Sequence, residues 1–274
     1  FMKKLAILIP LHKSNLNDHE KKSLQYIVKK SDNKNIFLIL PEKLRDSFNY
    51  KNLNKVYFSD KYFISQKTYN KLLLSLDFFL KFNSFDYALI YQLDSYLIQG
   101  SERLKDFFNE DYVGSPHINV KKKRFNGILN GGFSLRAIGP SINVLSSVKI
   151  HFTLNSVISI LRYFTALNRL KSFIKFFFRI IFIYISDKFY KKEKILISQI
   201  IINNFSDYYN EDIFWSLFSK LFVKNFKVAK FDTAIKFSFD KDPEVLFGLN
   251  DNQLPLGCHN WWNDKNINFW KKYF

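Results

Sequence analysis

The sequence predicts a doubly wound α/β fold, with a mixed β-sheet flanked by helices and a helical insertion. Strand-like and helix-like segments alternate over about the first hundred residues, as they do in sheets built from β-α-β units. Hydrophobic residues make up 47% of the 274 residues, which is enough to bury a substantial core. This length suits one large domain or one domain with an insertion.

The first half of the chain supplies most of the predicted sheet. Leu5–Leu11 is a continuous apolar run, typical of a strand that is buried on both faces. The run also imitates a signal peptide, but Pro10 interrupts it and no small-residue cleavage site follows, so we expect a strand. Two helices are predicted next, over His19–Lys30 and Thr68–Phe82. Three further strands are predicted over Asn35–Leu40, Lys55–Phe58 and Tyr87–Gln92.

The pattern changes in the second half. Residues 150–204 contain no glycine or proline and place single Lys and Arg residues among Phe, Ile and Leu. Before this block we expect a strand over Asp111–Pro116, a glycine-rich stretch over Asn126–Arg136 and a helix over Ser141–Val148. After it we expect a helix with an acidic first turn over Asn210–Phe222. We expect residues 1–149 to form the main α/β part, 150–204 a helical insertion, and 205–274 the rest of the same domain.

The charge of the chain restricts its partners. The formal net charge is +18, from 42 basic and 24 acidic residues, which favours nucleic acid, phosphorylated small molecules or an acidic membrane. The basic residues are spread along the chain without a nucleic-acid-binding motif, so nucleic acid is the less favoured partner. The single cysteine, Cys258, excludes an intramolecular disulfide and a cysteine-rich zinc site, and we expect a cytoplasmic protein.

Four short polar motifs are the candidates for chemistry. Asp94 ends the apolar strand of "DYALIYQLDSYLI", where a buried carboxylate is costly unless it is paired or binds a metal. In open α/β sheets, ligands bind beyond the carboxyl ends of the strands, which is where Asp94 lies. Taken alone, each motif has a structural explanation: a turn, a helix cap or a packed histidine. The other three are Gly131-Gly132, Glu211-Asp212 and His259.

In their order and spacing, these motifs resemble the sugar-nucleotide-dependent glycosyltransferases of the GT-A fold. The closer likeness is to bacterial enzymes of surface-polysaccharide (capsule) biosynthesis, in a domain family long without an assigned function. The resemblance covers nearly the whole chain outside residues 150–204, through "YQLDSYL", "DYVGSP", "NGGFSLR", "NEDIFW" and "PLGCHNWW". It implies that residues 1–149 bind a nucleotide-sugar, with a UDP-sugar favoured, and that residues 205–274 face a surface glycan or a lipid-linked acceptor.

The resemblance also implies a divalent cation. GT-A enzymes usually carry an Asp-x-Asp sequence whose last Asp binds the metal, and here that sequence reads Gln92-Leu93-Asp94. Asp94 and His259 would then hold Mn²⁺ or Mg²⁺, and a carboxylate with an imidazole suits Mn²⁺ better. Because an amide replaces the first carboxylate, stabilisation of the leaving diphosphate by Lys or Arg without a metal stays open.

Further roles follow from the same resemblance. Asp212 is the expected general base of an inverting reaction, and Glu211 is expected to bind the acceptor. For Arg136, contact with a phosphate and pairing with an acid are equally open. For Trp261 and Trp262, stacking on a sugar and packing in the core both stay open. The residues expected at the donor are Pro10, His12, Lys13, Gln92, Asp94 and Ser95, and those of the loop between donor and acceptor are Asn130, Gly131, Gly132, Phe133, Arg136 and Trp261.

The block at residues 150–204 fits one or two amphipathic helices. Such helices could lie on the anionic inner face of the cytoplasmic membrane, with basic side chains reaching the headgroups. Packing within the chain or in a homodimer is equally open. Two other functions remain alternatives: a non-catalytic scaffold that binds a sugar nucleotide, and a basic nucleic-acid-binding protein.

Overall fold

A computed structural model gives the fold. It describes single positions between residues 171 and 205 and the continuous ranges 3–31, 35–47, 52–120, 124–151, 153–166 and 209–274. Much of the predicted insertion therefore lies outside the described residues, and so does the choice between membrane contact and self-association.

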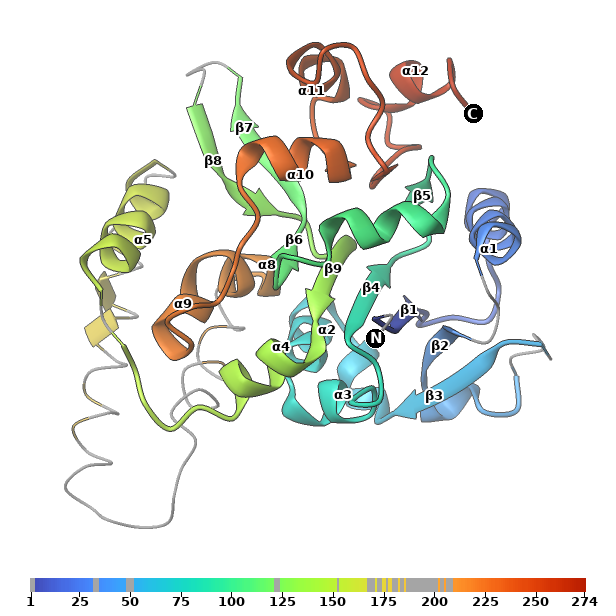
Figure 1. Cartoon of the computed structure of the whole chain (residues 1–274). Coiled ribbons are helices and arrows are strands. Elements are labelled where there is room, and N and C mark those ends of the chain that lie inside the picture. Colours follow the sequence, from blue (N-terminus) through green and yellow to red (C-terminus); the bar gives the residue numbers. More distant parts are fainter. Residues whose placement is uncertain are drawn as a thin grey trace.

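A six-stranded mixed sheet forms the centre of the molecule, in the order β3-β2-β1-β4-β9-β6 (Figure 1). The first four strands of the chain are parallel, and β9 runs antiparallel to both of its neighbours, β4 and β6. This confirms the predicted α/β fold with a mixed sheet. The strands are β1 (Leu5–Pro10), β2 (Ile36–Pro41), β3 (Asn54–Phe58), β4 (Tyr87–Tyr91), β6 (Tyr112–Val113) and β9 (Phe133–Ala137).

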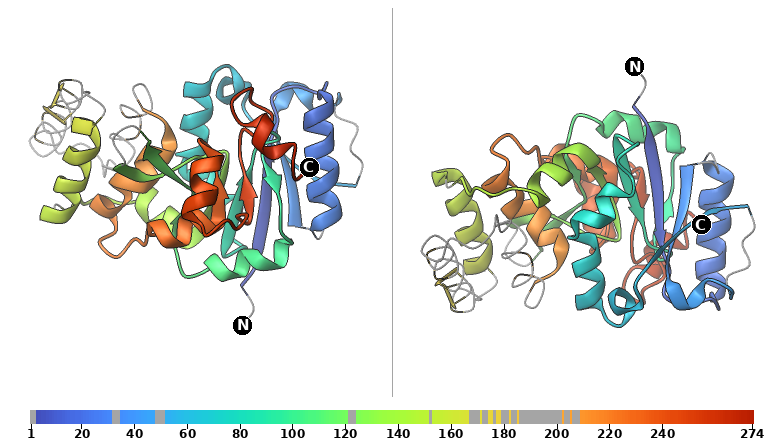
Figure 2. Two further views of the ribbon diagram at one scale, coloured as in Figure 1. Left: turned by 90° about the horizontal axis from the view of Figure 1, so that it is seen from above. Right: turned by 90° about the horizontal axis from the view of Figure 1, so that it is seen from below.

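Helices cover both faces of this sheet (Figure 2). Helix α1 (Asp18–Lys30) begins at a capping box formed by Asn17 and Glu20. The single helix predicted over 68–82 is instead two helices, α2 (Gln66–Leu73) and α3 (Leu76–Leu80). The break has a local cause, because the Ser75 side chain accepts a hydrogen bond from the Phe78 N–H and caps α3.

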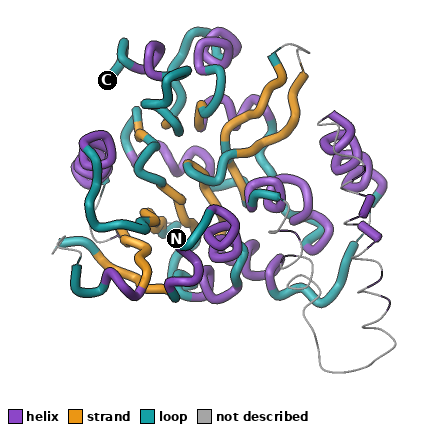
Figure 3. The backbone as a smooth tube through the Cα atoms, turned by 180° about the vertical axis from the view of Figure 1, so that it is seen from behind, coloured by secondary structure: helices purple, strands orange, loops and turns teal. Residues whose placement is uncertain are grey.

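Two small sheets stand beside the central one. The strand predicted over 111–116 divides at Gly114, so that β7 (Ser115–Asn119) leaves the central sheet and pairs with β8 (Arg124–Leu129), as Figure 3 shows from behind. In the other small sheet, β11 (Gly257–Cys258) lies between β10 (Ser238–Phe239) and β5 (Tyr96–Leu97). Because β5 closely follows β4, this pairing brings the far part of the chain to the end of β4.

The largest buried cluster is rich in aromatic side chains, which include Trp215, Phe133 and Phe214. A π-helical turn, Phe214–Phe218, joins α8 to α9 within the helix predicted over 210–222. Among the described residues, no helix combines the length and the apolar character needed to cross a membrane. The other helical elements are η2 (Glu42–Leu44), η3 (Asp60–Phe63), η4 (Ser101–Phe107), α4 (Ile138–Leu145), α5 (Leu154–Ala166), α8 (Glu211–Ile213), α9 (Ser219–Phe222), α10 (Phe231–Phe237), α11 (Pro243–Leu249) and α12 (Ile267–Trp270).

Candidate functional site

A cleft of about 730 Å³ opens at the carboxyl ends of β1 and β4. Pro10 ends β1, and the segment from Gln92 to Asp94 follows β4 directly. The loop before β9 lies at the same edge because β9 runs antiparallel to β4, with Tyr91 opposite Phe133. The cleft is therefore where an open α/β sheet binds its ligands, as predicted from Asp94.

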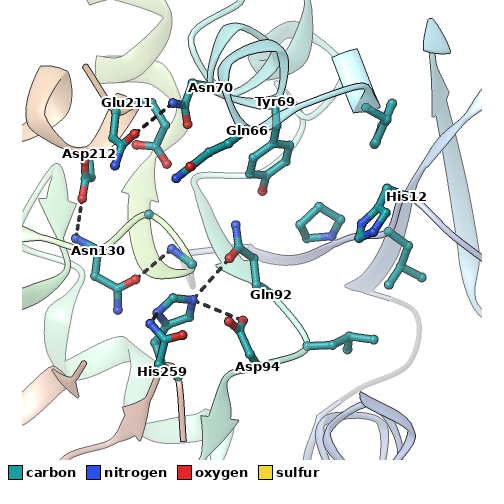
Figure 4. Close-up of a pocket in the computed structure, with 18 of the residues that line it drawn as sticks. His12, Gln66, Tyr69, Asn70, Gln92, Asp94, Asn130, Glu211, Asp212 and His259 are labelled. Atoms are coloured by element: carbon teal, nitrogen blue, oxygen red, sulfur yellow. Dashed lines mark hydrogen bonds and ion pairs between the residues drawn. The ribbon is translucent and has the colours of Figure 1, made fainter. Parts of the chain in front are cut away.

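His259 and Asp94 meet in this cleft (Figure 4). The imidazole Nε2 lies 3.2 Å from Asp94 Oδ1 and 3.3 Å from Gln92 Oε1. The other ring nitrogen, Nδ1, lies 2.9 Å from Oδ1 of Asp240, a residue that follows β10. Burial lowers the pKa of His259, but the carboxylates of Asp94 and Asp240 raise it more strongly, to about 10. Without a cation the imidazole is therefore protonated at neutral pH and donates to both sides, and a cation bound at Nε2 would replace the proton there.

The same three groups fit a divalent cation. Gln92 Oε1, Asp94 Oδ1 and His259 Nε2 offer an amide oxygen, a carboxylate oxygen and an imidazole nitrogen at one place, a donor set that suits Mn²⁺ better than Mg²⁺. Asp240 lies behind the imidazole, as a carboxylate commonly does behind a metal-binding histidine. Within the described ranges no cluster of three His, Cys, Asp or Glu side chains is placed to hold a metal, so Gln92 would be the third protein ligand.

A glycine loop allows these groups to converge. Asn130 has a φ of 79°, and its Oδ1 accepts a hydrogen bond of 2.9 Å from the Gly132 N–H. A Cβ atom at Gly132 would overlap the His259 imidazole, and one at Gly131 would overlap the Glu211 carboxylate. Glycine is therefore required at both positions by close approach of side chains rather than by backbone conformation.

Gly132→Ala is expected to weaken cation-dependent ligand binding at least about tenfold, because the added methyl group must displace His259. The measurement is the Mn²⁺ dependence of nucleotide binding by calorimetry. Gly248→Ala is the matched control, since nothing lies within 4 Å of a Cβ atom at that position. Equal Mn²⁺ dependence of binding in both variants would contradict the role of His259 as a cation ligand.

The two carboxylates of α8 have different surroundings. Asp212 is half-buried, and its two oxygens accept hydrogen bonds of 2.9 Å from the Asn130 N–H and 2.8 Å from the Ile213 N–H. Burial raises the pKa of Asp212 above its usual range, and these bonds oppose the rise. Glu211 is buried and forms an ion pair of 2.9 Å with Arg136. Burial raises the pKa of Glu211 to about 7, although Arg136 lowers it.

Most of the predicted site residues line the cleft. Lys13 lines it while pairing with Glu20 at 2.9 Å, and Glu211 lines it while pairing with Arg136. The predicted residues found in the lining are Pro10, His12, Lys13, Gln92, Asp94, Asn130, Gly131, Gly132, Glu211, Asp212 and His259.

Four predicted residues lie behind the cleft wall instead. Arg136 is fully buried and pairs with Glu211, which is the acid-pairing alternative for this residue. Ser95 donates a hydrogen bond of 3.1 Å to the Gly132 carbonyl, and Phe133 packs in the core. Trp261 packs against Tyr96 and Phe274.

Of the two adjacent tryptophans, Trp262 faces the cleft. It lines the cleft and stacks on His19, with ring centroids 5.2 Å apart and an interplanar angle of 18°. Core packing therefore applies to Trp261, and a position facing the ligand applies to Trp262.

Sequence reasoning missed two sets of cleft residues. Gln66, Tyr69 and Asn70 line the cleft from α2, and their spacing of three and four residues places them on one face of the helix. This spacing of polar residues is visible in the sequence and indicates a polar helix face. Asp240 follows a strand as Asp94 does, but β10 has two residues and shows no strand pattern in the sequence.

Residues 52–259 match the family described as "Protein of unknown function (DUF5672)". No curated protein matches the chain.

Solved glycosyltransferase structures are similar to the chain at low identity. The galactosyltransferase LgtC, in complex with donor and acceptor sugar analogues, is 11% identical with a TM-score of 0.49, over 98% of this chain and 93% of that chain. The bifunctional glycosyltransferase WbbM is 9% identical with a TM-score of 0.40, over 94% and 46% of the two chains. The apo form of GlyE from Streptococcus pneumoniae TIGR4 is 12% identical with a TM-score of 0.39, over 99% and 60%. This chain thus spans less than two thirds of the WbbM and GlyE chains.

Proposed function

The chain belongs to the DUF5672 family, and we propose that it is a glycosyltransferase that uses a nucleotide-sugar donor, with a UDP-sugar favoured. The acceptor is a hydroxyl group of a surface glycan or a lipid-linked glycan. The observation that carries the proposal is the arrangement of one cleft. A candidate cation pair, Asp94 and His259, and a candidate base, Asp212, line it on either side of the Gly131-Gly132 loop.

The proposed reaction is a direct displacement with inversion. The acceptor hydroxyl oxygen forms a bond to the anomeric carbon while the bond from that carbon to the diphosphate oxygen breaks. Asp212 takes the hydroxyl proton as general base, and the nucleoside diphosphate leaves with the bonding electrons. The orientation of Asp212 by the N–H groups of Asn130 and Ile213 supports this role.

The leaving diphosphate must be stabilised as its charge develops. A cation held by Asp94, His259 and Gln92 would supply a positive charge at the diphosphate oxygens. Lys13 and Lys241 also line the cleft and add positive charge to the donor side. The Asp240 carboxylate would orient the His259 ring toward the cation.

A thermal-shift panel tests the donor site. UDP, GDP, CMP and dTDP sugars, each with and without Mn²⁺, would be compared with the free protein. One nucleotide type is expected to stabilise the protein, by about 2.7 kcal/mol at a hundredfold excess over Kd. Mn²⁺ should enlarge the shift, and Asp94→Asn should remove that enlargement.

Asp251→Asn is the matched control for the Asp94 variant. Asp251 is exposed, and its positive φ of 53° is one that asparagine tolerates, so this variant should keep the full shift. If no nucleotide shifts the melting temperature of cooperatively unfolding protein, the proposed function is wrong.

A further inference from the structure

Three polar atoms in the cleft wall are buried and lack a hydrogen-bond partner among the described residues. They are the Tyr69 hydroxyl, Nδ2 of Asn130 and Oε2 of Glu211. They come from three separate elements: α2, the loop between β8 and β9, and the start of α8. Buried polar groups in folded proteins normally have partners, and an unpaired one is destabilising. Three such atoms in one cleft indicate a ligand that completes them.

Two of these atoms are held in fixed directions. Oδ1 of Asn130 accepts a hydrogen bond from the Gly132 N–H. This bond fixes the orientation of the amide group, so Nδ2 points away from Gly132 and cannot exchange positions with Oδ1. Oε1 of Glu211 accepts from Arg136 Nη2, which leaves Oε2 free. Asn130 is 6% exposed and Glu211 3% exposed, so both side chains are largely removed from bulk solvent.

The third atom, the Tyr69 hydroxyl, points into the cleft beside Gln92 (Figure 4). A tyrosine hydroxyl keeps its proton at neutral pH and can both donate and accept a hydrogen bond. Removal of this one oxygen would leave the ring and its packing unchanged.

The three atoms lie between the two halves of the catalytic arrangement. Asn130 bonds to Asp212 through its N–H, and Tyr69 lies beside Gln92, which contacts His259. A sugar joined to a diphosphate near Asp94 must pass through this space for its anomeric carbon to face Asp212. The unpaired atoms therefore lie where the transferred sugar of such a donor would be placed, rather than its nucleotide.

We infer that Tyr69, Asn130 and Glu211 form the subsite for the transferred sugar, and that this sugar is a neutral hexose with free hydroxyl groups. The inference rests on the proposed function. Each sugar hydroxyl both donates and accepts, so hydroxyls can satisfy the Asn130 donor, the Glu211 acceptor and the Tyr69 hydroxyl together. An ionised carboxylate on a uronic or sialic acid would face the Glu211 carboxylate, and Arg136 could not compensate the repulsion because it is buried behind Glu211 and already paired with it.

Calorimetric binding in the presence of Mn²⁺ tests this inference. The ligands are UDP, UDP-glucose, UDP-galactose, UDP-glucuronate, GDP, GDP-mannose and CMP-N-acetylneuraminate. A neutral sugar nucleotide should bind more tightly than its own nucleoside diphosphate. Tyr69→Phe should weaken binding of that sugar nucleotide roughly two- to tenfold, the usual effect of one hydrogen bond, and leave binding of the nucleoside diphosphate unchanged.

Tyr62→Phe is the matched control, because Tyr62 lies on η3 outside the cleft lining. Asn130→Asp is a second variant: it keeps the oxygen that accepts from Gly132 and removes the donor nitrogen. It should also weaken the sugar nucleotide selectively, which keeps the test valid if one variant folds poorly.

The outcomes separate this inference from the proposed function. Preference for UDP-glucuronate or CMP-N-acetylneuraminate would overturn the neutral-sugar subsite while supporting a sugar-nucleotide enzyme. Equal loss of nucleoside diphosphate and sugar nucleotide in Tyr69→Phe would overturn the subsite alone. Absence of binding by every nucleotide would overturn both.

Discussion

Replacing Asp212 with asparagine is expected to slow sugar transfer by roughly two to four orders of magnitude, the usual contribution of a general base. The amide has the shape of the carboxylate but cannot take the hydroxyl proton of the acceptor. Binding of the nucleoside diphosphate should be unchanged, because the cation pair of Asp94 and His259 is untouched. The measurement is the turnover number with a saturating donor, together with the Kd of the nucleoside diphosphate. Asp232→Asn, an exposed acid in α10, is the control that should keep full activity.

The pH dependence gives a second measure of the same residue. Asp212 acts as a base only when ionised, and burial raises its pKa above that of an ordinary aspartate. The rate should therefore fall on the acid side at a higher pH than an exposed aspartate would give. If Asp212→Asn keeps the wild-type rate and the same acid limb, Glu211, with a pKa of about 7, becomes the base instead.

Arg136→Met is expected to cost about 3–5 kcal/mol of unfolding free energy, the usual effect of breaking a buried ion pair. Arg136 has 0% exposure, pairs with Glu211 at 2.9 Å and lies 5.8 Å from the ring centres of Tyr112 and Trp215. Methionine would fill much of the volume but leave the Glu211 carboxylate buried and unpaired. Destabilisation, rather than loss of a substrate contact, is thus the first effect of this substitution.

The deficit should grow as the pH rises. Arg136 lowers the pKa of Glu211, so its removal lets the folded-state pKa rise above about 7, while the unfolded value stays near 4.5. A raised folded pKa gives stability that is present below the unfolded pKa and is lost as the pH rises through the folded one. The variant should therefore be less stable at pH 8 than at pH 5, relative to the wild type.

Denaturant unfolding at both pH values measures this effect. Arg136→Met combined with Glu211→Gln removes the unpaired charge, so the double variant should recover part of the loss and its pH dependence should flatten. Arg103→Met is the matched control: Arg103 pairs with Asp106 at 3.2 Å on the surface, where such pairs contribute about 0–1 kcal/mol. A loss no larger than that of the control would contradict the buried pair.

The strands of the central sheet are the part of the fold that the sequence predicts best. β1, β2 and β4 are apolar runs that end at a proline or a polar residue, and such runs predict strands without knowledge of their neighbours. The division of the helix over 68–82 was missed because Ser75 has no unusual helix propensity, and its capping role depends on the direction that the chain takes after α2. The two-residue strands β10 and β11 are defined by their partners and have no pattern of their own.

Site residues could be predicted from the sequence where the neighbouring residues show which element they belong to. Asp94, at a strand end, and Gly131-Gly132, in a loop, lie in the cleft as expected. For Arg136 the sequence left two alternatives, since nothing local reveals that its partner, 75 residues away, is a buried glutamate. Tertiary packing decides whether a charged or aromatic side chain faces the ligand or supports a residue that does.

The proposed cation site of Gln92, Asp94 and His259 also sets an order of events during biosynthesis. Gln92 and His259 are separated by 167 residues in the chain, and β11 reaches the cleft only by pairing with β5. Ribosomes add about 5–20 residues per second, so roughly 10–30 s pass between the synthesis of these two positions. A nascent chain can assemble β1 to β4 in that interval, but it lacks the imidazole. Under the proposed function, the growing polypeptide therefore cannot assemble the cation site until β11 has been made and has docked.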